Sequence, residues 1–240
     1  MSQALRIPIL MYHKVDRLNR RSQIPGHYVS PNLFRKQMIV LSAMGYTSVP
    51  LSHLYRSDVK LPRKPVVITF DDGYENFLIN ALPILKSQNF VSTVFLVANQ
   101  LGGTNEWDSR NGDVEERLMD VRQILEAHSG GTEFGSHTSD HADLNAVPKE
   151  EARRQIVDSK VKLEETLNLP IETFCYPYGR KNPEVEKMVA EAGYRLACST
   201  EKGLNTDTTN PFALHRINVR RDTNVPVFIM KLLRGKRSDG

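Results

Sequence analysis

The amino-acid sequence predicts an α/β fold with a mainly parallel sheet. Apolar segments rich in β-branched residues alternate with segments whose apolar residues recur at helical spacing, and this alternation is typical of parallel sheets. A length of 240 residues suits one α/β barrel, and neither an internal repeat nor a linker of disordered composition divides the chain. We therefore expect one domain over residues 1–240.

The first half of the chain carries clear signals for the start and end of its elements. Ser30 precedes Pro31, and a capping serine followed by a first-turn proline predicts the start of a helix, which Gly45 ends. Residues 17–28 are polar and residues 100–113 are irregular, so we expect both to be loops. The expected strands of this half are residues 7–11, 65–70, 91–97 and 131–136, and its expected helices are residues 31–44, 51–57, 80–88 and 114–128.

The second half continues the same alternation. Its clearest helix is residues 148–167, because Ala152, Ile156, Leu163 and Leu167 share one face while charged residues fill the others. The remaining expected helices are residues 183–192 and 225–233, and the expected strands are residues 171–176, 194–199 and 212–219. In a parallel barrel the loops that follow the strands gather on one face, so the site is expected there.

Two adjacent carboxylates follow the buried strand of residues 65–70. Asp71 and Asp72 come directly after its apolar run, and Gly73 follows them. Neighbouring side chains of an extended chain point to opposite sides, so the two carboxylates would have different roles unless Gly73 lets the backbone turn. We interpret the pair as a metal ligand beside a base, although Asp and Gly also build ordinary turns.

A pair of histidines follows the strand of residues 131–136. His137 and His141 are four residues apart, a spacing that lets two imidazoles converge on one metal. With Asp72 they would supply three protein ligands and leave one position for water, which is the ligand count of a catalytic zinc site. The alternative is a pair of solvated loop histidines.

The composition is that of a soluble globular protein, with 40% hydrophobic and 25% charged residues. The net charge of +4 comes without a dense basic run before residues 231–237, which we interpret as a solvated tail, so no nucleic-acid partner is expected. No stretch approaches the roughly 20 apolar residues of a membrane span. The start does not resemble a secretion signal, so we expect a cytoplasmic protein, while action outside the cytoplasm stays open. Cys175 and Cys198 lie in apolar contexts and are interpreted as buried thiols.

Together these motifs resemble the polysaccharide deacetylase family, carbohydrate esterase family 4. The resemblance rests on residues 69–73 and 137–141. It extends to residues 8–13, 174–179 and 214–219, so it runs through most of the chain. It implies a distorted (β/α) barrel, a divalent metal, taken to be zinc, and hydrolysis of N-acetyl groups on N-acetylglucosamine-containing poly- or oligosaccharides. The expected partner is therefore an N-acetylated carbohydrate, and the oligomeric state stays open.

The resemblance also implies roles for the candidate residues. Asp71 would be the catalytic base, and Asp72, His137 and His141 the metal ligands. The leaving sugar amine needs a proton donor, for which His13 and His215 compete. We favour His13, because residues 11–15 resemble the subgroup that acts on partially deacetylated poly-N-acetylglucosamine.

One position departs from the family pattern. Many members have an arginine where this chain has Cys175, and that arginine orients the base carboxylate. Arg216 is expected to supply the missing cation. If Arg216 points into the site, strand alternation turns His215 away from it.

Two aromatic residues complete the expected site. Tyr178 matches the family pattern beside the oxyanion pocket, and Trp107 is the only tryptophan of the chain. Trp107 would either stack on a sugar ring or anchor its loop by burial. Two other functions stay open, namely hydrolysis of a different amide C–N bond on the same barrel and non-catalytic carbohydrate binding.

Overall fold

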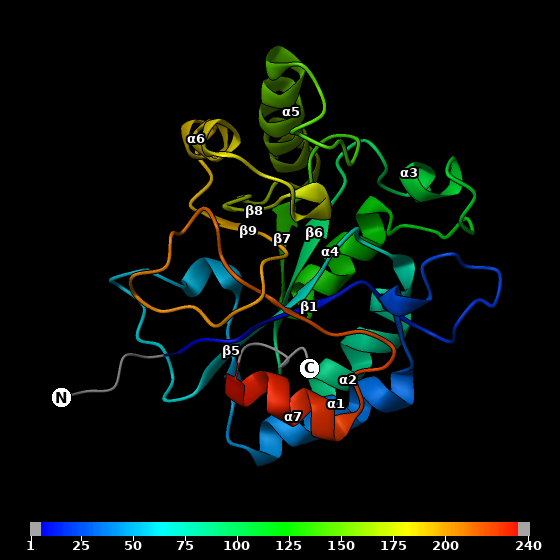
Figure 1. The fold of residues 1–240 in the computed structure, drawn as a ribbon, viewed down its shortest axis with the longest axis vertical. Helices are drawn as coiled ribbons and strands as arrows, with labels where there is room; N and C mark the ends of the chain where they lie inside the picture. The colour runs from blue at the N-terminus through cyan, green and yellow to red at the C-terminus, as the bar shows by residue number, and fades with distance from the viewer. Residues whose placement is uncertain (1–5, 235–240) are drawn as a thin grey trace.

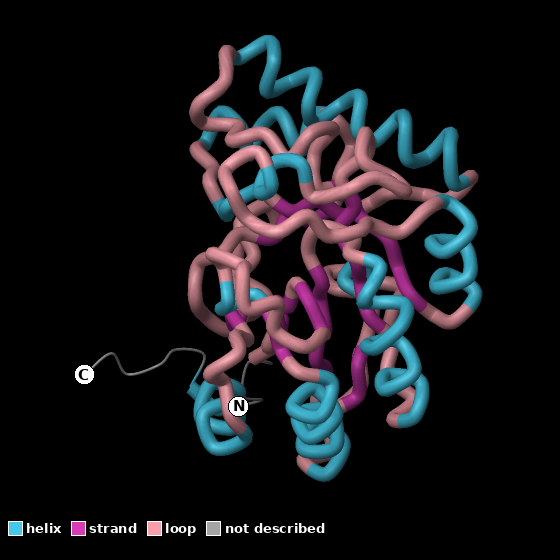
Figure 2. Tube along the Cα trace, turned by 90° about the vertical axis from the view of Figure 1, so that its right-hand side faces the viewer, coloured by secondary structure: helices cyan, strands magenta, loops and turns pink. Residues whose placement is uncertain are grey.

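An eight-stranded parallel sheet runs through the centre of the protein, in the order β10–β1–β5–β6–β7–β8–β9 with β4 paired to β5. The computed structural model describes residues 6–234. Its strands lie in the interior with helices outside them (Figure 2). The strands are β1 (Ile9–Tyr12), β4 (Thr47–Ser48), β5 (Pro65–Phe70), β6 (Ser92–Leu96), β7 (Thr132–Ser136), β8 (Thr173–Cys175), β9 (Leu196–Cys198) and β10 (Ile217–Asn218), and β2 (Lys14–Val15) pairs separately with β3 (Tyr28–Val29).

The sheet curves into a distorted (β/α) barrel. The segment 214–218 joins its two edges, because Leu214 bridges Cys198 of β9 while Ile217 pairs with Leu10 of β1. Between these two contacts the backbone amide of Arg216 donates to Glu201 instead of to a strand, so the ladder is interrupted there. The expected α/β class and distorted barrel are confirmed, but the expected strand 212–219 is reduced to β10 and one bridge.

The helices cover the outside of the barrel. Figure 1 shows α1, α2 and α7 gathered on one side of the sheet and α5 and α6 beside its other end. Their apolar faces pack on buried strand residues such as Leu10, Ile68 and Phe174 to form the main core. The helices are α1 (Pro31–Ala43), α2 (Leu82–Ser87), α3 (Glu106–Ser109), α4 (Val121–Ser129), α5 (Lys149–Leu167), α6 (Pro183–Glu191) and α7 (Val225–Arg234).

The helix expected over residues 114–128 is wrong in its first half. Asp120 accepts a hydrogen bond from the amide of Gln123, and the Gln123 side chain accepts one from the amide of Asp120, so this capping box starts α4 at Val121. Before it, Arg117 and Leu118 form antiparallel bridges with Thr104 and Tyr74. These bridges use the backbone groups that a helix would have needed.

Smaller differences concern the short elements. The helix expected over 51–57 is a single 3₁₀ turn, Leu51–His53, because Leu54 is already extended. The loop expected over 100–113 contains α3, and a π-helical turn, Phe77–Ala81, precedes α2. The basic segment 231–237 lies partly outside the described residues. Within residues 6–234, no helix has the length and apolar character that crossing a bilayer requires.

Candidate active site

A pocket of about 460 Å³ opens at the carboxyl ends of the strands, where the alternation of strands and helices predicts a site. All the predicted site residues except Arg216 line it, namely His13, Asp71, Asp72, Trp107, His137, His141 and Tyr178. Arg216 lies directly behind Asp71 and is fully buried. Residues from distant parts of the sequence therefore meet in one place.

Both aspartates face this pocket because the backbone turns at the end of β5. Asp72 has a φ of +74° and Gly73 a φ of +75°, so the strand conformation stops immediately after Asp71. A side chain at position 73 would place its Cβ 2.8 Å from the side chain of Leu96. Glycine at position 73 thus allows the backbone to turn, and the turn lets Asp71 and Asp72 face the same pocket instead of pointing to opposite sides.

Arg216 holds Asp71 through two parallel hydrogen bonds. Its Nη1 donates to Oδ1 at 2.6 Å and its Nη2 to Oδ2 at 2.8 Å. The guanidinium also donates to the carbonyl of Ser199 at 2.8 Å and to the Cys175 sulfur at 3.1 Å, which fixes its plane. Burial by itself would raise the pKa of Asp71, but the charge and hydrogen bonds of Arg216 outweigh it, so that pKa lies below its usual value. Asp71 is therefore a buried, oriented carboxylate.

Asp72, His137 and His141 form a convergent set of potential metal ligands. The Nε2 atoms of both histidines lie 3.4 Å from Oδ1 of Asp72, and all three residues are buried. Nδ1 of His137 lies 2.7 Å from the carbonyl of Cys175, which only accepts, so Nδ1 carries a proton and Nε2 is the nitrogen that could bind a metal. Oδ1 of Asp72 is buried and accepts no hydrogen bond within the described chain. These donors fit a divalent ion with nitrogen and oxygen ligands.

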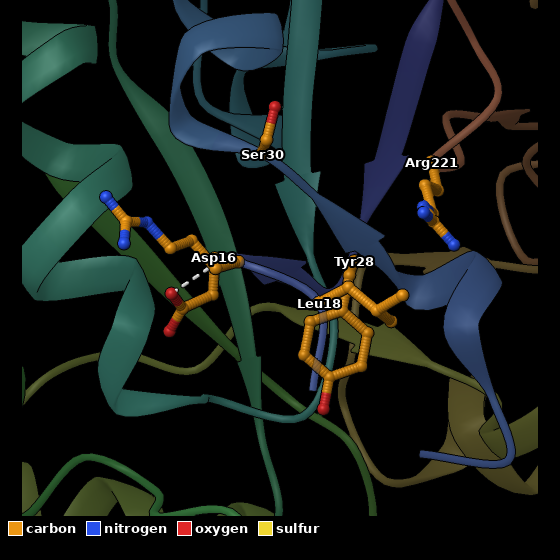
Figure 3. A pocket seen from close by; sticks show the side chains of 6 residues that line it. Asp16, Leu18, Tyr28, Ser30 and Arg221 are labelled. Atoms are coloured by element: carbon orange, nitrogen blue, oxygen red, sulfur yellow. Dashed lines mark hydrogen bonds between the residues drawn. The ribbon is translucent and has the colours of Figure 1, made fainter. Parts of the chain in front are cut away.

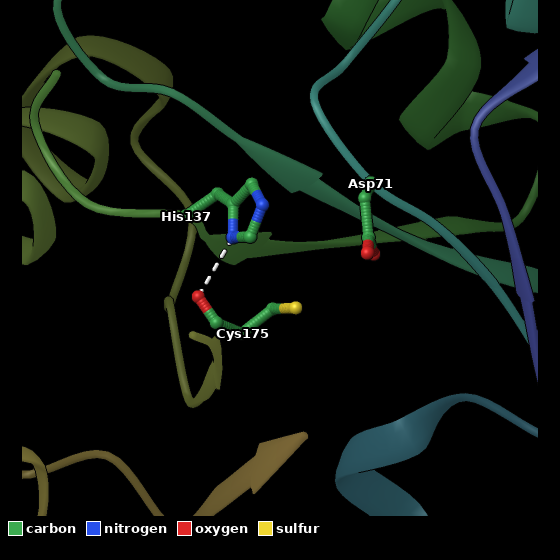
Figure 4. A group of neighbouring side chains, drawn as sticks. All are labelled: Asp71, His137 and Cys175. Atoms are coloured by element: carbon green, nitrogen blue, oxygen red, sulfur yellow. Dashed lines mark hydrogen bonds between the residues drawn. The ribbon is translucent and has the colours of Figure 1, made fainter. Parts of the chain in front are cut away.

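A second group, Asp71, His137 and Cys175, is less suitable for a metal although its atoms also lie close together (Figure 4). Both oxygens of Asp71 accept from Arg216, and so does the Cys175 sulfur. Burial raises the pKa of the Cys175 thiol to about 11, so this side chain is a neutral thiol and not a thiolate ligand. Cys175 instead helps to hold Arg216, which orients the Asp71 carboxylate.

His13 lies beside Asp71 in the loop between β1 and β2. Its Nε2 is 3.8 Å from Oδ2 of Asp71, and its ring stacks on that of His27 with centroids 3.9 Å apart. Because β1 pairs directly with β5, His13 is next to the carboxylate and not across the barrel from it. Burial lowers the pKa of His13, and the charges of Asp71 and Asp72 partly offset this.

His215 lies outside the pocket, as strand alternation predicts for the neighbour of Arg216. Its side chain is 35% exposed, and its Nε2 is 3.4 Å from a carboxylate oxygen of Glu201. The ring also packs against Gly203, where a Cβ would come within 2.6 Å of its Nδ1. Of the two candidate proton donors, only His13 reaches the pocket.

Two aromatic side chains flank the second histidine of the metal set. Trp107, on α3, stacks on His141 with centroids 4.5 Å apart, and Tyr178 contacts the same ring edge-on at 4.7 Å. Tyr178 is 49% exposed at the rim and has a φ of +59°. Trp107 is partly buried, stacks on His141 and lines the pocket, and its stacking on a sugar ring stays a prediction.

Among the polar residues of the pocket that sequence reasoning missed are the ionisable side chains of His27 and Asp108. His27 lies in the segment expected to be a polar loop, and no spacing links it to another motif. Asp108 directly follows Trp107 in the sequence, and this adjacency to a predicted site residue is the signal that could have identified it. Burial and the nearby charge of Asp72 raise the pKa of Asp108 to about 6.

A different hollow, of about 380 Å³, lies beside the β2–β3 pair (Figure 3). It is lined by Asp16, Arg17, Leu18, Tyr28, Ser30 and Arg221. Among residues 6–234, the groups able to hold a metal include none of these side chains. The chemistry of a catalytic site is therefore concentrated in the pocket at the strand ends.

Comparison with known proteins agrees with this geometry. The family described as "Polysaccharide deacetylase" matches residues 58–197. The Bacillus subtilis protein YxkH is 30% identical over 217 residues, which cover 89% of this chain and 71% of the relative. A poly-beta-1,6-N-acetyl-D-glucosamine N-deacetylase of Staphylococcus aureus is 25% identical over 234 residues, covering 89% and 78%. The structure of the Streptococcus pyogenes deacetylase PplD in complex with acetate superposes with a TM-score of 0.82 at 26% identity, covering 96% of this chain and 99% of that one.

Proposed function

Because the chain belongs to the polysaccharide deacetylase family, we propose that it removes N-acetyl groups from N-acetylglucosamine-containing poly- or oligosaccharides and that it does so with a divalent metal. The observation that carries the proposal is the placement of an oriented carboxylate, Asp71, beside the Asp72, His137 and His141 set in one pocket. The similarity to the S. aureus enzyme supports a β-1,6-linked polymer as substrate.

The metal would be held by Oδ1 of Asp72 and by the Nε2 atoms of His137 and His141. Two imidazoles and one carboxylate are a ligand set that suits zinc and leaves room for water and substrate. When bound there, zinc would supply the Lewis acidity that makes water nucleophilic near neutral pH and polarises the acetyl carbonyl. The remaining chemistry belongs to the protein.

Asp71 acts as the base that removes a proton from the attacking water. Arg216 keeps this carboxylate ionised and fixes its plane, so Asp71 needs no reorganisation before the reaction. His13 in its protonated form then donates a proton from Nε2 to the nitrogen of the leaving sugar amine, which cannot depart as an anion, and the ring is left as a neutral imidazole. The attacking oxygen and the leaving nitrogen are bonded to the same carbon, so neighbouring residues such as Asp71 and His13 can serve both.

Substrate is held at the rim by aromatic side chains. Tyr178 is half exposed there and Trp107 lines the adjoining wall, and aromatic faces of this kind stack on pyranose rings. Many family members have an arginine at the position of Cys175, and here Arg216 provides that positive charge beside the Cys175 sulfur. The cysteine therefore gives no reason to prefer hydrolysis of a different amide C–N bond. Non-catalytic carbohydrate binding would not require a carboxylate that is oriented and kept ionised as Asp71 is.

Acetate release tests the proposal. The purified protein, loaded with zinc, is incubated with β-1,6-linked N-acetylglucosamine oligomers and with chitooligosaccharides, and acetate is measured over time. We expect zinc-dependent release that is faster on the β-1,6 series, and Asp71→Asn serves as the inactive control. Absence of acetate from both series would refute the proposed activity, and equal release without metal would refute the metal dependence.

A further inference from the structure

The pocket contains more carboxylate charge than the protein itself compensates. Asp71 is paired with Arg216, and Asp72 faces two imidazoles. Asp108 also lines the pocket, but the ion pairs of the described residues do not include it. The pocket wall itself, as far as residues 6–234 form it, has neither a lysine nor an arginine. Its chemistry therefore suits a positively charged group in addition to a metal.

Asp108 is held in place by neutral donors. The buried hydroxyl of Tyr74 donates to its Oδ2 at 3.3 Å, and the side chain of Asn105 also stabilises the carboxylate. Its helix, α3, carries Trp107 next to it, and Trp107 is stacked on His141. The carboxylate is thus fixed at the pocket wall, beside an aromatic ring that lines the same space.

Lys14 acts on Asp108 through its charge but does not neutralise it. Lys14 is fully buried, and its ammonium lies 4.6 Å above the ring of Tyr74 and 4.0 Å from Asp113. It therefore interacts with those groups and forms no ion pair with Asp108. Burial and the charge of Asp72 raise the pKa of Asp108 to about 6, while Lys14 lowers it only in part. At neutral pH Asp108 is a half-buried carboxylate that a cationic ligand would stabilise.

We propose that Asp108 binds the protonated 2-amino group of a glucosamine unit that neighbours the N-acetylated unit under attack. This inference rests on the proposed function, because deacetylation itself creates that ammonium group along the polymer. The net charge of the chain is +4, so the protein as a whole does not attract a cationic polymer, and the proposed binding does not depend on overall charge. The preference would come from the local carboxylate, with Trp107 in position to contact the sugar ring that bears the amine.

A preference for partially deacetylated substrate follows. We would measure kcat/KM with a β-1,6-linked N-acetylglucosamine tetramer and with tetramers in which one unit is glucosamine. The zinc-loaded enzyme is expected to favour at least one mixed tetramer by about 5- to 20-fold, the effect expected of a half-buried charge-assisted hydrogen bond. Asp108→Asn should remove this preference through KM, and Asp108→Glu should restore part of it. Asp58→Asn, which changes an exposed aspartate outside the pocket, should leave the ratio unchanged.

Binding provides a measurement that does not depend on catalysis. The fully deacetylated glucosamine tetramer offers no acetyl group for hydrolysis, so its Kd can be determined by calorimetry for each protein. We expect Asp108→Asn to bind it about 5- to 20-fold more weakly than the wild type and Asp108→Glu to bind it more tightly than Asp108→Asn. Equal Kd values, or an unchanged kcat/KM ratio, for the wild type and Asp108→Asn would overturn the inference. If the wild type released no acetate from any tetramer, the proposed function would fail, while the Kd comparison would still decide the role of Asp108.

Discussion

Arg216 and Asp71 are 145 positions apart in the sequence, yet their side chains form two hydrogen bonds of 2.6 and 2.8 Å in the interior. Asp71 directly follows the strand β5, and Arg216 directly precedes β10 at the closure of the barrel. The base of the proposed reaction is therefore oriented by the segment that closes the sheet. The proposed catalysis therefore depends on correct closure of the barrel by the segment that carries Arg216.

Replacing Arg216 should damage activity and stability together. Arg216→Met leaves the buried Asp71 carboxylate without its partner, and breaking a buried ion pair in this way costs about 3–5 kcal/mol. Arg216→Lys keeps the charge but loses the paired geometry, so its kcat should fall by about 10²-fold with a smaller loss of stability. Acetate release and urea unfolding check both effects. Wild-type kcat in Arg216→Lys would show that the orientation of Asp71 is unimportant.

The same pair should appear in the pH dependence of stability. The pKa of Asp71 is lowered in the folded protein, so the pair adds stability above the usual aspartate pKa of about 3.9, and that stability is lost as the pH falls through the folded-state pKa. In Arg216→Met, burial raises the pKa of Asp71 instead, so ionisation above pH ~4 becomes destabilising. Urea unfolding of the zinc-free proteins between pH ~3 and ~7 measures this difference. Parallel stability curves for the two proteins would argue against it.

The metal set should respond to loss of either histidine. His137→Ala and His141→Ala each leave two protein ligands, and we expect both variants to lose zinc on dialysis and to lose turnover. His215→Ala is the matched control, because His215 lies outside the pocket and should leave the zinc content unchanged. Elemental analysis measures bound zinc. Full occupancy in either of the first two variants would remove that histidine from the metal site.

Asp71 should be separable from the metal ligands. Asp71→Asn is expected to retain zinc and to lose about 10²- to 10⁴-fold in kcat, the usual contribution of a general base. Zinc content and acetate release measured on the same preparation provide the test. Should zinc be lost along with activity, Asp71 would be a metal ligand and the group containing Cys175 would have to be reconsidered.

The two candidate proton donors should behave differently. His13→Ala is expected to lower kcat without loss of zinc and to remove the alkaline limb of the pH–rate profile. His215→Ala should have a small effect, since that ring is partly exposed and paired with Glu201. Rates measured across the pH range for both variants decide between them. An active His13→Ala together with an inactive His215→Ala would reverse the assignment.

The contiguous motifs could be predicted from sequence because their geometry is local. The apolar run of β5 places Asp71 and Asp72 at a strand end, and the spacing of His137 and His141 permits convergence without knowledge of the rest of the fold. The start of α1 was also predictable, since Ser30 caps it through the amide of Leu33. Such signals depend on residues within a few positions of one another.

Other features depended on neighbours that the sequence does not identify. Residues 114–120 carry a helical pattern, yet their backbone groups pair with Thr104 and Tyr74 and α4 begins only at Val121. The stacking of His27 on His13 and the hydrogen bond of Tyr74 to Asp108 likewise join segments that are separate in the sequence. Their pKa shifts follow from burial, which no sequence window reports.

By itself, the sequence determined the α/β class, the strand that ends in two carboxylates and the candidate ligands of the metal. Only the tertiary structure decided that Asp71 and Asp72 both face the pocket, that Arg216 reaches Asp71, and that His215 does not enter the site. The physical reason is that parallel strands adjacent in a barrel are distant in the chain. Contacts across their ends are decided by packing and closure, whereas a sequence pattern records only the local preferences of the backbone.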